Sequence, residues 1–169
     1  MNGTDHSARR FAGYAALFSL VLAILLVAAV LGYVSARPAL LSLLSRNAAF
    51  EGRYSDAEAY LHTLEELDRE RFYQETLSLA SIADYRSDWD TATALLENEL
   101  QAGGSDAAYA AFAPKAEELL KQCRYHSALQ LYQQQEYTKA SRLAASITNY
   151  EPAESLYQLS YQAYLNSLP

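Results

Sequence analysis

The longest uncharged stretch of the chain lies near its N-terminus and limits what that segment can become. Between Arg10 and Arg37 there are 26 residues without a charged side chain, FAGYAALFSLVLAILLVAAVLGYVSA. A helix needs about 20 apolar residues to cross the hydrocarbon core of a bilayer. Tyr14 and Tyr33 lie near the two ends, where amphipathic rings favour the membrane interface. The sequence therefore predicts a short tail over 1–10 and one transmembrane helix over 11–36.

Two other interpretations of this stretch stay open. A helix buried in a soluble core would also be apolar, but uncharged runs of this length are rare outside membranes. A cleaved signal peptide would end at a site with small residues, and Val34-Ser35-Ala36 provides one. The apolar core of a signal peptide is normally about 7–15 residues, much shorter than this run. We therefore expect an uncleaved signal anchor.

The arginines on the two sides of the stretch bear on its orientation. Arg9 and Arg10 directly precede it, whereas Arg37, Arg46 and Arg53 follow it at wider spacing. Cytoplasmic flanks carry an excess of Lys and Arg, and acidic residues count for little in this rule. The two sides are nearly balanced by count, but the adjacent pair favours an N-terminus inside the cell. We expect a single-pass protein of the cell membrane with its remaining residues on the extracytoplasmic side.

The composition of residues 37–169 excludes several classes of partner. Of the 13 basic residues only Arg9 and Arg10 precede this region, and of the 20 acidic residues only Asp5 does, so the region carries a net charge of about −8. Nucleic-acid binding and docking on an anionic membrane surface both require basic patches. A single cysteine, Cys123, excludes an intramolecular disulfide and a thiolate metal cluster. We expect no nucleic acid, no cofactor and no metal.

The same region has helical spacing throughout and no alternating strand pattern, so we expect an all-α domain over 37–169. Glycine stops helices and proline begins them, which makes Gly103-Gly104 the clearest break and Pro152 the start of the last helix. The expected helices cover 39–50, 55–67, 72–85, 89–101, a short segment ending before Pro114, 115–134, 137–148 and 152–168.

Short polar residues mark where several of these helices begin. Gly52 ends the first helix, and Ser55 and Asp56 begin the second. Either Ser87 or Asp88 caps the fourth. The pair at 105–106, Ser-Asp, caps the helix that follows the two glycines.

One short motif occurs three times in this region: an aromatic residue, an alanine three positions later, and a third core residue four positions after that. An aromatic ring fills the space where two helices diverge near a turn, and an alanine permits close approach where they cross. The third side chain lies one turn further on the same face. Helix pairs of this size bury too little surface alone and therefore stack. The copies are Tyr54, Ala57 and Leu61; Trp89, Ala92 and Leu96; and Tyr137, Ala140 and Ala144.

On these residues the chain resembles the tetratricopeptide repeat family, whose period is about 34 residues. Gly52, Ser87 and Gln135 occupy the turn position, and Pro152 falls where the family often has its closing proline. The chain departs from the family pattern in three ways. Only the first copy keeps the turn glycine, the signature tryptophan of the first helix is missing, and the second and third copies are 48 residues apart. The segment AGGSDAAYAAFAP is therefore an insertion or a degenerate half-repeat. Small residues of the first helices also agree, at Ser45, Ala80 and Ala128.

The resemblance covers about residues 39–168. The sequence pattern of this region is similar to that of degenerate helical repeats in membrane-anchored bacterial proteins. It implies a short solenoid of about three helix pairs with a capping helix, whose concave face binds a protein or peptide. The chain would then be a non-enzymatic interaction scaffold attached to the bilayer by its N-terminal helix. For Tyr125 and Leu129 we favour the other interpretation, packing on the next helix, and for Tyr132 the two interpretations are equally open. The residues that the resemblance places on the concave face are Arg46, Gln74, Ser81, Asp84, Gln122, Tyr125, Leu129 and Tyr132.

Two other functions stay open. An envelope enzyme would use Cys123 and His126, which are three positions apart, although we expect nothing nearby to supply an orienting carboxylate or an oxyanion hole. A structural subunit would pack its transmembrane helix on a partner, and the segment over 12–16 provides small residues for such contact. These small residues are Ala12, Gly13, Ala15 and Ala16.

Two further groups of residues have a functional and a structural interpretation. His62 lies within one helical turn of Glu58, Glu65 and Glu66, which suggests either a metal site or, more simply, a solvated helix face. Tyrosines are frequent after the membrane segment, where they suggest a carbohydrate-binding surface or the core of the repeats. Those of the last helix, Tyr157, Tyr161 and Tyr164, either cap the stack or mediate self-association.

Overall fold

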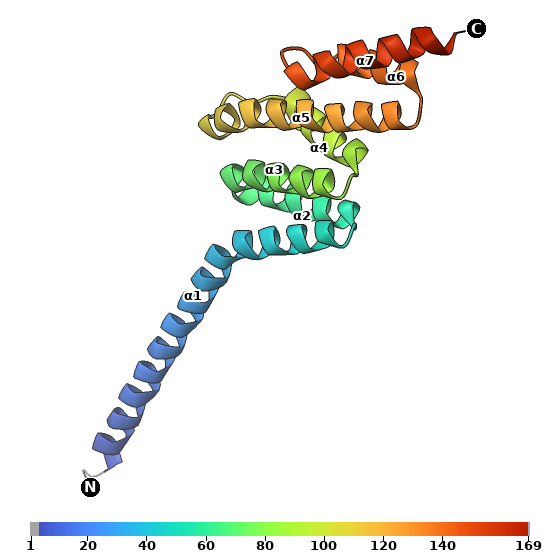
Figure 1. The fold of residues 1–169 in the computed structure, drawn as a ribbon. Helices are drawn as coiled ribbons and strands as arrows, with labels where there is room; N and C mark the ends of the chain where they lie inside the picture. Colours follow the sequence, from blue (N-terminus) through green and yellow to red (C-terminus); the bar gives the residue numbers. More distant parts are fainter. Residues whose placement is uncertain (1–3, 169) are drawn as a thin grey trace. The chain divides into compact units, whose positions relative to one another are not determined.

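The computed structural model describes the backbone of residues 4–168 and the side chains of Ser19 and residues 21–168. This part of the chain contains helices and no strand, so the predicted all-α class is confirmed. The chain divides into two compact units, one ending at Leu40 and the other beginning at Leu41. The helices are α1 Thr4–Phe50, α2 Tyr54–Leu67, α3 Arg69–Tyr85, α4 Trp89–Ala102, α5 Ala107–Gln133, α6 Tyr137–Ala145 and α7 Glu151–Ser167 (Figure 1).

The part of α1 that belongs to the first unit exposes its described apolar side chains, from Val21 to Val34. Leu25 and Leu31 are 62% and 63% exposed. From Val21 onward the helix has a mean hydropathy of 2.0 in its most apolar window, and none of that window is buried. A helix of a water-soluble fold buries its apolar stripe against a neighbour. One helix of the described chain is thus long and apolar enough to cross a membrane. Tyr14 and the small residues over 12–16 lie outside the described side chains.

Two prolines that were expected to separate helices lie inside them instead. Pro38 is within α1, so the separate helix over 39–50 is wrong, and Pro114 is within α5, so the short helix before it is wrong. A proline removes one backbone hydrogen bond and crowds the carbonyl one turn earlier. In α5, Phe112 and Ala116 lie on either side of Pro114 and are both buried in one core. Their burial favours a helix that continues through the proline.

The helix starts show which polar residues act as caps. The Asp68 side chain accepts a hydrogen bond of 3.0 Å from the Arg71 backbone, so α3 begins three residues before the predicted Phe72. Asp88 and Asp106 cap α4 and α5 in the same way, as expected. Ser55 and Asp56 do not cap α2, because that helix begins at Tyr54, and α6 ends at Ala145 instead of 148.

The three turns predicted from the repeated motif share one backbone geometry. Gly52, Ser87 and Gln135 have positive φ angles of 79°, 61° and 65°. At each turn the amide of this residue donates to the carbonyl three residues earlier, and the next amide donates to the carbonyl five residues before it. These two bonds define a Schellman motif, which satisfies the free carbonyls of a helix end. The same turn therefore closes three helix pairs: the end of α1 with α2, α3 with α4, and α5 with α6.

The alanines of the motif are buried in the way that the packing argument predicts. Ala57, Ala92 and Ala140 are all 0% exposed. The residue one turn later is also buried in each copy, as Leu61, Leu96 and Ala144. The aromatic members of the motif, Tyr54, Trp89 and Tyr137, are partly buried.

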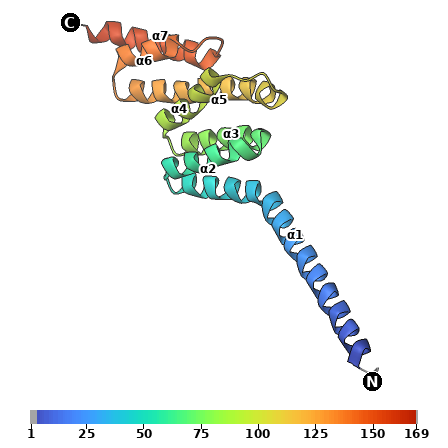
Figure 2. The ribbon, with the colours of Figure 1, turned by 180° about the vertical axis from the view of Figure 1, so that it is seen from behind.

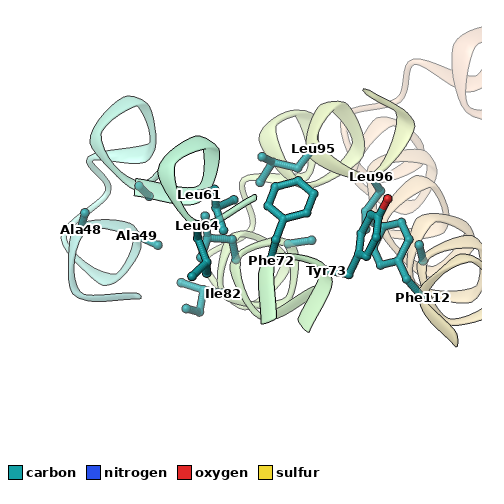
Figure 3. Packing of buried hydrophobic residues seen from close by; sticks show 14 of the residues in the cluster. Ala48, Ala49, Leu61, Leu64, Phe72, Tyr73, Ile82, Leu95, Leu96 and Phe112 are labelled. Carbon is teal, nitrogen blue, oxygen red and sulfur yellow. The ribbon is translucent and has the colours of Figure 1, made fainter. Parts of the chain in front are cut away.

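The largest core joins the end of α1 to α2, α3, α4 and α5 (Figure 3). In this core the ring of Tyr73 is stacked on that of Phe112 with their centroids 4.8 Å apart, and it is tilted against that of Phe72 at 5.1 Å. Leu61, Leu64, Leu79 and Ile82 are buried in the same core, and Leu77 is partly buried against it.

A smaller core joins α5, α6 and α7 through Ala128, Ala144 and Leu156. Within the second unit, α3 contacts α2, α4 and α5, whereas α7 contacts α5 and α6 (Figure 2). Helices close in sequence therefore pack on one another along this unit.

Candidate functional site

The residues predicted to face a partner come from α1, α3 and α5. In the second unit α3 and α5 contact each other directly. The residues of these two helices therefore meet in space, although about 40 positions separate them in the sequence.

Asp84 is the predicted residue with the most contacts across this pair of helices. Its Oδ1 lies 2.8 Å from Nδ1 of His126, and its Oδ2 accepts a hydrogen bond of 3.4 Å from Gln122. The Asp84 side chain is 12% exposed. The structure thus brings Asp84 and Gln122 together and adds His126, which was not among the predicted contact residues.

Arg46 is held by an acid that the sequence did not indicate. Its Nε and Nη2 donate to the two carboxylate oxygens of Glu75 at 2.6 and 2.7 Å. These hydrogen bonds raise the pKa of the Arg46 guanidinium. Glu75 has only 4% of its side chain exposed, and a buried carboxylate requires such a partner. The first role of Arg46 is therefore to neutralise Glu75 and join α1 to α3.

Gln74 and Ser81 lie on the exposed side of α3. Gln74 borders a cavity of about 340 Å³ between α3 and α5, together with Tyr73, Leu77 and Lys115. The Ser81 hydroxyl donates to the carbonyl of Leu77 at 2.8 Å. Gln74 therefore has a concave surface beside it.

Tyr125, Leu129 and Tyr132 pack against the small core of Ala128, Ala144 and Leu156. The ring of Tyr125 meets that of Tyr150 edge-on at 5.7 Å, and the ring of Tyr132 lies 5.5 Å from that of Tyr137. All three are partly buried. The geometry favours packing on the following helices for Tyr125 and Leu129, and gives Tyr132 a similar structural role.

The pair Cys123 and His126 has a carboxylate partner after all. The expectation that none lies nearby was wrong, because Asp84 comes from α3, 42 residues away in the sequence. Cys123 is fully buried, and burial together with the charge of Asp84 raises its pKa to about 12. A nucleophilic cysteine needs a lowered pKa, because the thiolate is the reactive form. This thiol stays protonated at neutral pH and fills space beside Ala83 and Ala92.

His62 borders a cavity of about 140 Å³ with Glu58 and Glu99. Burial, followed by the charge of Glu65, raises the pKa of Glu99. The described residues contain no group of three or more His, Cys, Asp or Glu side chains placed to hold a metal ion. The described geometry here is that of a partly solvated helix face.

Sequence reasoning missed Glu75 and His126, which organise the contacts of Arg46 and Asp84. Neither has a local signal, because each partner lies 29 or 42 residues away on another helix.

Comparison with known proteins gives no match for this chain, whether with family models, with curated proteins or with solved structures.

Proposed function

We propose that this chain is a membrane-anchored scaffold that binds other proteins through its helical unit, with helix pairs of the tetratricopeptide type. The observation that carries the proposal is the threefold recurrence of one turn, in which residues 52, 87 and 135 share the left-handed backbone and its two hydrogen bonds. Recurrent pairs of this kind stack and present the side chains of their first helices side by side. Such stacks serve as binding surfaces in proteins without a catalytic centre.

The N-terminal helix supports attachment to a bilayer. Its described apolar side chains from Val21 to Val34 are exposed, and no part of the unit that ends at Leu40 covers them. Lipid would cover these side chains and remove their contact with water. The anchor in this proposal fixes the location of the helical unit and leaves the recognition to α3 and α5.

The arrangement around Cys123 supports a passive role over thiol chemistry. A thiol with a pKa of about 12 is ionised to roughly one part in 10⁵ at pH 7. The carboxylate of Asp84, which lies beside His126, adds to this shift instead of opposing it.

Protease treatment of intact cells without a wall tests the orientation that this function requires. We expect the helical unit to be digested from outside, which would direct the search to partners in the cell envelope. Protection until the membrane is lysed would contradict the extracytoplasmic placement.

Photocrosslinking tests the binding surface itself. A crosslinking amino acid at Gln74 or Gln122 should form adducts with other proteins in living cells, because both side chains are exposed on the α3–α5 face. The matched control places it at Glu66, an exposed position on α2. Equal adducts at all three positions, or none at any, would contradict a specific surface on α3 and α5.

A further inference from the structure

A groove between α6 and α7 differs in the charge of its lining from three other cavities of the helical unit. It has a volume of about 310 Å³. Its polar lining consists of Thr138, Ser141, Arg142, Tyr157, Tyr161 and Tyr164. Each of these side chains has a hydrogen-bond donor, and the lining contains no carboxylate.

Three other cavities of the described residues each include an acid. The cavity between α3 and α5 contains Glu70, the one beside His62 contains Glu58 and Glu99, and the one next to the loop before α7 contains Glu151 and Glu154. The chain as a whole has 20 acidic residues against 13 basic ones. A groove that offers a guanidinium and no acid therefore differs from these three cavities.

Arg142 is available for a ligand. Most arginines in the described part of the second unit bond an acid or a carbonyl of the same chain, as Arg46, Arg124 and Arg86 do. Arg142 is exposed and makes no ion pair with any described residue. Its planar guanidinium can hold a carboxylate through two parallel hydrogen bonds.

Three tyrosines complete the recognition surface. The rings of Tyr157 and Tyr161 are stacked 6.0 Å apart on successive turns of α7, and 44% of the Tyr161 surface is exposed. Tyr and Arg are the residue types most enriched at the energetic centres of protein interfaces. Their rings provide apolar contact and their hydroxyls provide donors beside Arg142.

We propose that the groove between α6 and α7 binds an acidic segment of a partner protein, with a side-chain carboxylate on Arg142 and its apolar neighbours on the tyrosine rings. This inference rests on the proposed function but moves the contact away from the α3–α5 face. The net negative charge of the chain repels an acidic partner at long range. Charges more than about 8 Å apart are largely screened at physiological salt, so the contacts inside the groove decide the binding.

Selection of displayed peptides by the full chain in lipid nanodiscs tests this proposal. The probe is a library of random 12-residue peptides held within a loop, so that no peptide has a free carboxyl end. We expect the selected peptides to be enriched in Asp and Glu. The variant Arg142→Gln should bind them at least about tenfold more weakly, because a hydrogen bond to a charged group contributes about 1.5–3 kcal/mol.

Lys139→Gln is the matched control. It removes the same charge from the same helix, but Lys139 bonds Glu136 and does not line the groove. We expect its affinity to stay within about twofold of the wild type. Tyr161→Phe, which keeps the ring and loses the hydroxyl, should lie between the two. Circular dichroism melting of each variant checks that the fold is unchanged, as expected for exposed side chains.

The outcomes separate this inference from the proposed function. Selected peptides without acidic enrichment, or with equal affinity for wild type and Arg142→Gln, would overturn the groove and leave protein binding in place. No selected peptide at all would contradict both. A wild-type dimer in sedimentation that Arg142→Gln dissociates would assign the groove to a second copy of the chain and overturn the partner proposed here.

Discussion

The core over α1–α5 and the core over α5–α7 are built from different side chains. The first contains Phe72, Tyr73 and Phe112 in ring-to-ring contact. The second is a cluster of Ala128, Ala144 and Leu156, with partly buried tyrosines at its margin. Deleting a large buried side chain removes far more transfer and packing energy than deleting a small one. We infer that the second unit is most stable around α3 and opens first at α6 and α7.

Phe112→Ala tests the strong end of this comparison. We expect a loss of about 3–5 kcal/mol in the free energy of unfolding, because the ring is 1% exposed and leaves a cavity beside Tyr73. Urea unfolding of the full chain in nanodiscs, followed by circular dichroism, measures it. A loss below about 1 kcal/mol would show that the aromatic core is not the main source of stability.

Leu156→Ala tests the weak end. The side chain is 4% exposed, and we expect a loss near the lower end of the usual range of about 2–5 kcal/mol. Hydrogen exchange should show faster exchange in α6 and α7, with α3 and α4 unchanged. Uniform acceleration across all helices would mean that the two cores unfold as one.

The thiol of Cys123 lies in a small cluster on α5, shared with α3 and α4, and gives a prediction for alkaline pH. Its folded pKa of about 12 exceeds the ordinary value of 9.0, so the neutral thiol favours the folded state. This stability is fully present below pH 9 and is lost as pH rises toward 12, by up to about 1.4 kcal/mol per pH unit. The difference in unfolding free energy between pH 8.5 and 10.5 should be smaller in Cys123→Ala. An identical difference would show that the thiol does not titrate in this way.

Two fully buried serines, one near each core, allow the effect of a single hydroxyl group to be compared. Ser45 donates to the carbonyl of Ala57 at 3.1 Å, whereas the Ser160 hydroxyl has no hydrogen-bond partner among the described residues. We expect Ser45→Ala to destabilise the protein by about 1 kcal/mol and Ser160→Ala to stabilise it by up to about 1 kcal/mol. Urea midpoints that shift in the same direction for both variants would contradict this difference.

The turns provide the smallest effect. The backbone of Gln135 has a φ of 65°, a left-handed conformation that favours glycine. Gly52 occupies the equivalent position of the first turn. Gln135→Gly should stabilise the third pair by up to about 1 kcal/mol, and Gly52→Ala should destabilise the first by a similar amount. Thermal melting of the two variants measures both changes. Destabilisation by Gln135→Gly would indicate that its side chain contributes more than its strained backbone costs.

The features that were predicted correctly depend on residues close together in the chain. The turns at 52, 87 and 135, the buried alanines 57, 92 and 140, and the caps Asp88 and Asp106 all follow from spacings of a few residues. The predicted helix end before Pro114 was wrong, because the burial of side chains on both sides of this proline outweighs its local cost to the helix. The predicted contact residues lie on α1, α3 and α5, but the residues of the same chain that bond them could not be anticipated from the sequence.

The sequence by itself determined an apolar N-terminal helix and a helical unit whose three turns are alike, because helix formation and turn geometry depend on neighbouring residues. Only the tertiary structure decided that Arg46 neutralises Glu75, that Asp84 joins His126, and that Arg142 lies without an acid beside three tyrosines. Charges on separate helices meet or stay apart according to how the helices pack, and that packing depends on the whole core.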